Sequence, residues 1–394
     1  MTDGFPVTQT DILPDDANRA ILVGRIWDPR VSGPTPVLVD GENLRDISSL
    51  APTISQLLER DDLVARLSNA ASFPTVASFG DILAQSRPGT DTKTAHFLSP
   101  NDLQAIKASG VTFVASLLER VIEEQTRGDA SKADQIRTEI TGIIGDDLSQ
   151  VKPGSEKSAE IKRILIEKGA WSQYLEVGIG PDAEIFTKSP VMSAVGHGAH
   201  VGLHPISTWN NPEPEVVLAV TSNGKIVGAS LGNDVNLRDV EGRSALLLGK
   251  AKDNNGSCAI GPFIRLFDDH FTLETIKAAD IAMAVDGQND GYHLDAVSSM
   301  SQISRTPESL VGQAIGKHHQ YPDGFMLFLG TMFAPTDDRG GAGKGFTHQM
   351  GDLVTISTPS LGKLVNQVDR SDAINPWQFG ITALMTNLAA RGLL

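Results

Sequence analysis

The segment Glu213-Pro214-Glu215, together with the later Asp234, constrains the fold of this chain more than any other feature. Two carboxylates at positions i and i+2 of an extended segment point to the same side of a strand. Asp234 follows Glu215 by 19 residues, beyond one turn signal, so a neighbouring strand would bring it to the same place. We therefore expect a β-rich fold in which three hard oxygen ligands converge, as a magnesium-type site requires.

The sequence around these carboxylates predicts strands joined by tight turns. Residues 216–220 form an apolar run, Ser222-Asn223-Gly224-Lys225 is typical of a hairpin turn, and residues 225–231 return as a second strand. Further strands are expected over residues 20–27, 36–43, 325–329 and 353–357, the second of these including an Asp-Gly turn at residues 40–41. The glycine-rich segment 337–345 lacks the spacing of a phosphate-binding loop and is interpreted as a surface loop between strands.

The pattern of apolar residues over 101–146 differs from that of the strand regions and predicts helices. Apolar residues from Leu103 to Ile122 recur at helical spacing, and Ser99-Pro100-Asn101-Asp102 is a plausible helix start. A second helical piece carries Ile136, Ile140, Ile143 and Ile144, and residues 156–169 predict another helix after the turn at residues 152–155.

Length and composition bound the remaining choices. A chain of 394 residues suggests two domains, which we place at residues 1–155 and 156–394. The formal charge of −15 argues against a nucleic-acid partner, because phosphates require clustered lysine and arginine. The single cysteine excludes an internal disulfide, and neither a membrane span nor a leader pattern is recognisable. These features predict a cytoplasmic protein without a membrane partner.

An ordered set of short motifs gives the chain a family resemblance. The set comprises Glu213-x-Glu215, Gly232-Asn233-Asp234-x-x-x-Arg238-Asp239, Ala251-Lys252, Gly261-Pro262, Gly330-Thr331, Gly351-Asp352-x-Val354 and Leu361-Gly362-x-Leu364-x-Asn366-x-Val368. In this order the motifs resemble the fumarylacetoacetate hydrolase family over roughly residues 180–370. The resemblance implies an α+β fold, with a mixed β-roll catalytic domain around a metal site and a smaller N-terminal α+β accessory domain.

Within that family the chain is most similar to the dehydratases of 2-keto-3-deoxy-pentonates. Residues 176–188, 208–215 and 256–262 carry this similarity. It implies that Glu213, Glu215 and Asp234 hold Mg²⁺, with Mn²⁺ or Ca²⁺ as alternatives, and that a 2-oxo acid chelates the ion.

The resemblance also assigns pocket residues. It implies that Glu184 and Lys252 are catalytic, and a bound cation would lower the pKa of Lys252 so that it acts as a base. Substrate contacts are expected from Lys188, Arg238, Ser257 and Thr331. Lys188 and Arg238 also have structural alternatives, which for Arg238 are ion pairs with Asp239 or Glu241.

Other reactive side chains receive structural interpretations. Cys258 is expected to be a small buried residue, because no motif places a histidine to activate it. His197, His200 and His204 lack the flanking pattern of a zinc site and are placed on a strand–loop near the pocket rim. Lys250 is expected to be solvated.

The sequence thus predicts a homodimeric or homotetrameric dehydratase that converts a 2-keto-3-deoxy-pentonate to 2-oxoglutarate semialdehyde. One alternative is a carbon–carbon hydrolase of the acylpyruvate type, although the His–Glu pair that such family members use is not recognisable here. The other alternative, from a different class, is a non-catalytic sugar-acid-binding protein.

Overall fold

Two open mixed sheets organise the chain. In the computed structural model, residues 5–6, 8–127, 129, 132–133, 135, 138, 151–167, 171–341 and 343–394 are described. The strands of this part are β1 (Leu22–Asp28), β2 (Gly33–Asp40), β3 (Asn43–Asp46), β4 (Thr75–Ser78), β5 (His96–Leu98), β6 (Ala105–Ser109), β7 (Ile185–Ser189), β8 (His200–Leu203), β9 (Pro214–Val220), β10 (Ile226–Asp234), β11 (Cys258–Leu266), β12 (Asp280–Asp286), β13 (His293–Ser299), β14 (Phe325–Phe328), β15 (Leu353–Thr358) and β16 (Gly362–Arg370). The α-helices are α1 (Ile54–Leu58), α2 (Leu63–Leu67), α3 (Phe79–Gln85), α4 (Val114–Thr126), α6 (Glu156–Glu167), α7 (Gln173–Ile179), α8 (Arg238–Glu241), α9 (Leu248–Lys252), α10 (Leu273–Lys277), α11 (Pro307–Ala314) and α12 (Ile381–Ala390).

The larger sheet has eleven strands and combines sequence from both predicted domains. Its order is β4-β3-β2-β1-β11-β10-β9-β14-β6-β7, and β5 pairs with β1 outside this path. Strand β6 runs parallel to β14, with Phe325 opposite Ala105, whereas β1 is antiparallel to β11. The domain boundary at residue 155 stays a prediction, and strands from both sides of it share this sheet.

The smaller sheet covers one face of the larger one. It has five strands in the order β13-β12-β15-β16-β8. On β9, Val216 and Leu218 belong to the core cluster that includes Met283 and Ile356 of the small sheet. Val217 points the other way, into a second cluster. Strand β9 is apolar on both faces because both are covered, which explains its continuous hydrophobic run.

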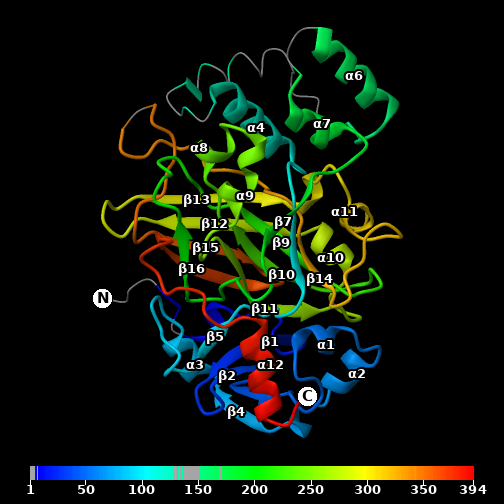
Figure 1. Cartoon of the computed structure of the whole chain (residues 1–394), viewed down its shortest axis with the longest axis vertical. Helices are drawn as coiled ribbons and strands as arrows, with labels where there is room; N and C mark the ends of the chain where they lie inside the picture. The colour runs from blue at the N-terminus through cyan, green and yellow to red at the C-terminus, as the bar shows by residue number, and fades with distance from the viewer. Residues whose placement is uncertain are drawn as a thin grey trace.

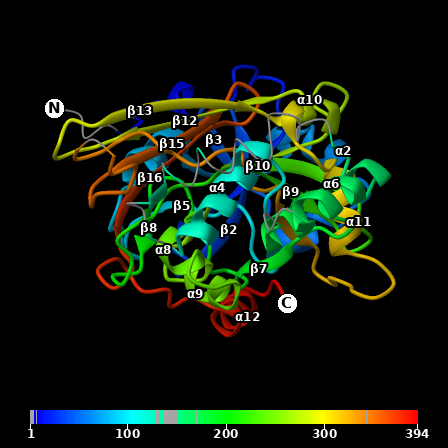
Figure 2. The ribbon, with the colours of Figure 1, turned by 90° about the horizontal axis from the view of Figure 1, so that it is seen from above.

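Helices cover both ends of the molecule, and others lie along its sides. Figure 1 shows α4, α6 and α7 at one end, and α1, α2, α3 and α12 at the other. In the view from above, the small sheet forms one side and α8, α9 and α12 lie on the opposite side (Figure 2). No helix in the described ranges combines the length and apolar character that a bilayer span needs. The α+β fold with mixed sheets expected from the sequence is confirmed.

Most predicted elements are confirmed, but the helix over residues 101–113 is wrong. Residues 105–109 form β6, inserted between β14 and β7, and the helix begins only at Val114. Ile106 and Ala108 are buried there by the sheet, so tertiary pairing overrides their helical spacing. The predicted helical residues Ile136, Ile140, Ile143 and Ile144 lie outside the described residues.

Asp102, expected to start a helix of its own, instead caps a distant one. Its Oδ2 accepts the backbone amide of Ile54 at 2.6 Å, and its Oδ1 accepts that of Ser55 at 2.9 Å. These amides form the first turn of α1, whose donors lack partners within the helix.

Asp102→Ala is therefore expected to lower the free energy of unfolding by about 2–3 kcal/mol, since two charge-assisted hydrogen bonds are lost at a buried site. Urea unfolding monitored by circular dichroism measures this change. Asp81→Ala, at an exposed position in the first turn of α3, is the control and should change stability by less than about 0.5 kcal/mol. Equal stability of the two variants would contradict the capping role.

Candidate metal centre and active site

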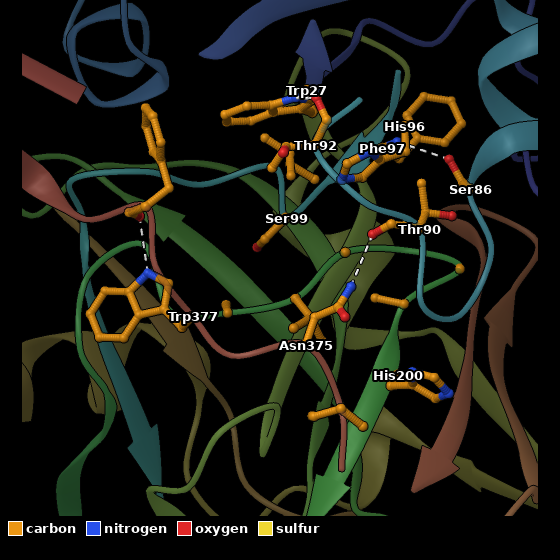
Figure 3. Close-up of a pocket in the computed structure, with 18 of the residues that line it drawn as sticks. Trp27, Ser86, Thr90, Thr92, His96, Phe97, Ser99, His200, Asn375 and Trp377 are labelled. Atoms are coloured by element: carbon orange, nitrogen blue, oxygen red, sulfur yellow. Dashed lines mark hydrogen bonds between the residues drawn. The ribbon is translucent and has the colours of Figure 1, made fainter. Parts of the chain in front are cut away.

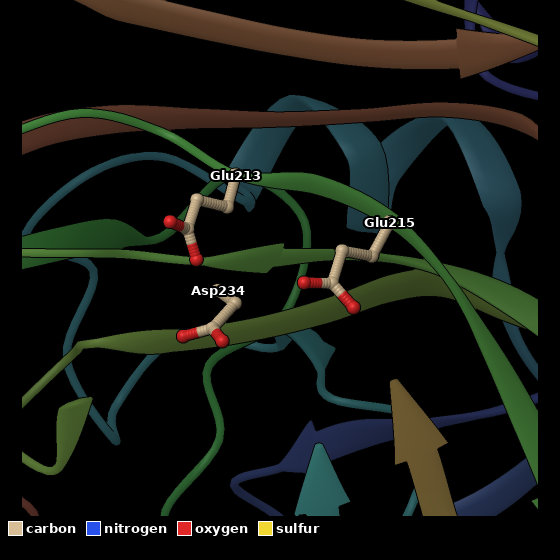
Figure 4. A group of neighbouring side chains, drawn as sticks. All are labelled: Glu213, Glu215 and Asp234. Carbon is tan, nitrogen blue, oxygen red and sulfur yellow. The ribbon is translucent and has the colours of Figure 1, made fainter. Parts of the chain in front are cut away.

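The three predicted carboxylates meet at the start of β9 and the end of β10. Glu213 immediately precedes β9, Glu215 lies on it, and Asp234 closes β10. The antiparallel register places Gly232 opposite Glu215, and the amide of Asp234 donates to the carbonyl of Glu213 at 3.0 Å. One oxygen from each of the three carboxylates lies within 4.8 Å of the others, and all three side chains are buried (Figure 4). The strand geometry expected from the sequence is thus present.

Two lysines reach into this acidic cluster. Lys252, at the end of α9, pairs with Glu213 and lies 3.2 Å from Asp234, from Nζ to Oδ2. Lys188, on β7, is fully buried and places its Nζ 2.7 Å from Asp234 Oδ1. It also donates to the backbone carbonyl of Lys252. Lys188 therefore contacts a predicted metal ligand and the loop that carries Lys252.

The third cation, Arg120, was missed by the sequence analysis. It is buried on α4, pairs with Glu213, and places Nη1 3.1 Å from Glu241 Oε2. Arg120 thus pairs with Glu241, which the sequence analysis considered as a partner of Arg238. The available signal was a charged residue inside an apolar helical stripe, three residues after Leu117 and one before Val121.

The charges of this cluster fit a divalent cation. The carboxylates are those of Glu184, Glu213, Glu215, Asp234 and Glu241, and the cations are Lys188, Lys252 and Arg120. Five negative groups against three positive ones leave two uncompensated negative charges if all are ionised. Burial raises the pKa of Glu215, and the nearby Asp234 and Glu213 raise it further. Carboxylates crowded away from water favour a bound hard cation.

Glu184 faces a narrow cavity beside the acidic cluster. The residues that line it are Ser109, Gly110, Val111, Arg120, Glu184, Phe186, Asp234, Glu241, Lys252 and Thr331. Burial raises the pKa of Glu184, and the opposing charges of Arg120 and Lys252 do not reverse this shift. A carboxyl group in such surroundings holds and transfers a proton closer to neutral pH than an exposed glutamate does. Both predicted catalytic residues therefore share one cavity with a predicted metal ligand.

The charges around Lys252 raise its pKa, whereas the sequence analysis expected a bound cation to lower it. Burial alone would lower the pKa of Lys252, but the carboxylates of Asp234, Glu213 and Glu241 outweigh burial and raise it. The protein groups alone therefore keep Lys252 as an ammonium ion. An ammonium ion can donate hydrogen bonds and stabilise negative charge, but it cannot act as a base.

Gly110, which immediately follows β6, packs against Glu184. Its amide donates to the backbone carbonyl of Glu184 at 3.0 Å. A Cβ atom added to Gly110 would lie 1.8 Å from Glu184 Oε2 and 2.6 Å from Cδ. The glycine is thus needed for space at the Glu184 carboxyl group.

Gly110→Ala is expected to lower turnover at least about tenfold, because the Glu184 carboxyl group must leave its position in the cavity. Steady-state rates and thermal unfolding of the variant and wild type test this. Gly249→Ala is the control, since an added Cβ there meets nothing within 4 Å. Retention of full activity by Gly110→Ala would show that the observed position of Glu184 is not required.

Two residues predicted to bind substrate, Thr331 and Ser257, form hydrogen bonds with residues of the acidic cluster and its lysines. Thr331 Oγ1 donates to Glu215 Oε1 at 3.2 Å and also lines the narrow cavity, and the neighbouring Gly330 amide donates to Glu215 Oε2 at 2.7 Å. Ser257 donates its hydroxyl to the carbonyl of Lys252 at 2.8 Å. Ser257 therefore fixes the end of α9, while Thr331 orients a predicted ligand and remains within reach of the cavity.

Arg238 occupies a structural position outside the narrow cavity. Its guanidinium lies 4.4 Å from the ring centroid of Trp209 and donates to the carbonyl of Pro335 at 3.1 Å. It also pairs with Glu119 Oε2 at 3.1 Å. The structure thus ties α8 to α4 through this residue.

None of the three histidines His197, His200 and His204 lines the narrow cavity, whereas Cys258 on β11 lies opposite Asp234 in the sheet. His197 Nδ1 accepts the amide of Val365 at 3.2 Å, whereas His204 Nε2 lies 2.8 Å from the Nζ of the exposed Lys250. His200 opens β8. Cys258 is buried as expected, and burial raises the pKa of its thiol to about 12, so it stays protonated.

Comparisons with known proteins place this architecture in a family. The profile of the fumarylacetoacetate (FAA) hydrolase C-terminal family matches residues 175–369. Residues 175–369 belong to the fumarylacetoacetate hydrolase family. This match contains the three carboxylates together with Glu184, Lys188, Lys252 and Thr331, and confirms the resemblance that the motifs had suggested.

Two curated relatives are 30% identical to this chain. One is the 2-dehydro-3-deoxy-D-arabinonate dehydratase of Saccharolobus solfataricus, matched over 187 residues, 48% of this chain and 59% of the relative. The other is a probable 2-keto-3-deoxyxylonate dehydratase of Haloferax volcanii, matched over 195 residues, 50% of this chain and 63% of the relative. The chain thus spans about three fifths of the length of the curated relatives it matches.

Solved structures share the fold over a larger part of the chain. The apo form of a 2-keto-3-deoxy-D-arabinonate dehydratase aligns with a TM-score of 0.59 at 20% identity, covering 89% of this chain and 99% of that one. The same kind of dehydratase complexed with magnesium and 2,5-dioxopentanoate aligns over the same shares with a TM-score of 0.59 at 19% identity. These alignments support the fold of the chain, including strands that precede the family match.

Proposed function

We propose that this chain is a metal-dependent dehydratase that converts a 2-keto-3-deoxy-pentonate to 2,5-dioxopentanoate, also called 2-oxoglutarate semialdehyde. The observation that carries the proposal is the buried trio Glu213, Glu215 and Asp234, with Lys252 and Glu184 at the same cavity. The names of the two curated relatives support dehydration as the reaction.

The trio would hold the cation, and Mg²⁺ fits three carboxylate ligands best, with Mn²⁺ or Ca²⁺ as alternatives of similar ligand chemistry. A divalent cation bound there supplies Lewis acidity to the carboxylate and keto oxygens of a 2-oxo acid. Gly330 and Thr331 hold Glu215 in place through both of its oxygens. The ligand set is therefore preorganised before substrate arrives.

The protein groups then divide the proton transfers. Glu184 accepts the proton from C3 of the substrate, and the Lys252 ammonium stabilises negative charge that develops at the keto oxygen. Glu184 returns a proton to the C4 hydroxyl as the C4–O bond breaks, so that one water leaves and a C3–C4 double bond forms. A proton then moves from C5 to C3, and tautomerisation of the resulting C4–C5 enol gives the C5 aldehyde of the product. The Lys252 base role expected from the sequence passes to Glu184, because nearby carboxylates raise the pKa of Lys252.

Hydrolysis of a carbon–carbon bond is the weaker alternative. Family hydrolases activate water with a His–Glu pair, and no histidine lines the narrow cavity within the part of the chain that the structure describes. His197, His200 and His204 lie elsewhere, as shown above. Dehydration needs no such pair, since Glu184 alone can move the proton between C3 and the leaving hydroxyl.

An activity panel tests the proposal directly. The protein is incubated with Mg²⁺ and 2-keto-3-deoxy acids of both C4 configurations, and the semialdehyde is followed through a coupled NAD-dependent aldehyde dehydrogenase. Semialdehyde formation from at least one pentonate is expected. Pyruvate formation would instead indicate carbon–carbon cleavage, and ligand uptake without product would indicate the binding protein considered above. A cytoplasmic location and a homodimeric or homotetrameric state remain predictions, the latter testable by light scattering.

A further inference from the structure

A second and larger cavity lies away from the acidic cluster. Its volume is about 560 Å³, and it shares no lining residue with the narrow cavity in the described part of the chain. The register of β1 with β5 sets Arg25 opposite Leu98 and Trp27 opposite His96, and all four residues line one wall. Residues from the segments 86–92, 192–200 and 374–379 form most of the others (Figure 3). Such a volume suits a small organic ligand.

Aromatic side chains give this cavity an apolar character. Trp27 and Phe379 meet edge to face, with ring centroids 5.2 Å apart. The indole N–H of Trp27 donates to the carbonyl of Thr92 at 2.6 Å, and that of Trp377 donates to the carbonyl of Phe379 at 3.0 Å. The polar edges of both tryptophans are therefore satisfied within the protein, which leaves their rings to contact an apolar ligand.

Arg25 supplies a buried positive charge to the same cavity. Only 4% of it is exposed, and among described residues its one hydrogen bond runs from Nε to the carbonyl of Ser99 at 2.9 Å. It forms no ion pair with a described carboxylate. The nearby Asp102 favours the charged guanidinium, but both of its oxygens accept backbone amides of α1. Buried arginines are normally paired, so this one points to an anionic ligand.

His197 adds a second unmatched polar group. It is 1% exposed and lines the cavity, and its Nε2 has no hydrogen-bond partner within the described ranges. Because Nδ1 accepts the amide of Val365, the ring carries its proton on Nε2. An uncompensated buried donor is costly unless a ligand oxygen accepts from it, and Arg25 lines the same cavity.

We propose that this cavity is a binding site for a small organic monocarboxylate with an apolar body. The carboxylate would accept hydrogen bonds from Arg25 and His197, and the body would lie against Trp27, Phe379 and Trp377. Arg87 and Asp91 also line the cavity and carry opposite charges, so the positive charge of Arg25 remains to match one negative charge of a ligand. The aromatic walls favour a hydrocarbon or aryl group over a polyhydroxylated chain. The site requires neither the acidic trio nor the proposed reaction.

Tryptophan fluorescence offers a direct test, because two of the four tryptophans line the cavity. The probes are 3-phenylpropanoate, phenylacetate and 4-methylpentanoate, each paired with its neutral amide. Saturable quenching by at least one acid is expected, with the matching amide at least about tenfold weaker. The affinity should be unchanged by EDTA and in Glu215→Gln, which separates this site from the metal centre whatever reaction that centre catalyses.

Single substitutions test which residues of the cavity bind the carboxylate and which contact the apolar body of the ligand. Arg25→Gln should abolish the preference for acid over amide, whereas Arg30→Gln, at a surface position paired with Asp28, should keep it. Trp377→Ala is a second variant that should fold, as this side chain is 46% exposed, and it should weaken acid and amide alike. The proposal is overturned if no acid quenches saturably, if acids and amides bind equally, or if Trp377→Ala leaves both affinities unchanged.

Discussion

Replacing Glu215 with glutamine is expected to lower turnover about a thousandfold, or roughly 4 kcal/mol of transition-state stabilisation, while leaving the protein folded. Glutamine keeps the shape of the side chain and still offers an oxygen to the amide of Gly330, 2.7 Å from Glu215 Oε2. It removes one of three carboxylates in a cluster with excess negative charge, so affinity for the divalent cation falls. Burial also disfavours the ionised form of Glu215, so the neutral glutamine is tolerated at this buried position.

Initial rates under saturating Mg²⁺, together with calorimetric titration of the metal, measure both consequences. Glu160→Gln, an exposed position on α6, is the matched control and should behave as wild type. Thermal unfolding of the metal-free proteins checks that Glu215→Gln remains folded. If its turnover stayed within tenfold of wild type under the same saturating Mg²⁺, the trio would not be the catalytic metal site.

Glu184→Gln is expected to lower turnover by about 10²–10⁴-fold with metal affinity retained. Glutamine fills the same space beside Gly110 but carries no exchangeable acid proton. Because Glu184 is not one of the three clustered ligands, calorimetric titration of Mg²⁺ should match wild type. Equal loss of metal binding and turnover would instead make Glu184 part of the metal centre, and full activity would remove it from the mechanism.

The pH dependence of Glu184 supplies an independent readout. Burial raises the pKa of this carboxyl group, so it stays protonated to a higher pH than an exposed glutamate. As the group that accepts the C3 proton, it must be ionised, and kcat/KM should therefore rise with pH through a pKa above the ordinary carboxyl range. That acid limb should vanish in the residual activity of Glu184→Gln. A limb that persists unchanged in the variant would belong to another group.

The part of the site that follows from strand geometry was predictable from sequence. Glu213 and Glu215 flank a proline on one extended segment, and Asp234 lies one hairpin away, so alternation and register alone bring them together. Glu184 and Lys252 lie far from them in sequence, and only the family resemblance indicated their place. The strands around the trio were likewise predictable, since turn residues and apolar runs bound them locally.

The remainder depends on contacts between distant segments. Arg120 reaches Glu213 from 93 residues away, and no local pattern encodes that pairing. Strand β6 has helical spacing, yet its neighbours β14 and β7 decide its conformation. For Arg238 the sequence offered only Asp239 and Glu241 of its own helix as partners, and it could not indicate the contacts with Trp209 and Glu119. In each case tertiary context selects among options that local chemistry leaves open.

The position of β1 and β6 in the large sheet has a consequence for any shortened form of this protein. These two strands, both from the first 155 residues, cover the outer sides of β11 and β14, between which the ligand-bearing strands lie. A chain starting after residue 155 would present β11 and β14 as bare edges with unpaired amides and carbonyls. Such edges pair readily with other chains, so we expect the shortened protein to aggregate rather than survive as a smaller enzyme.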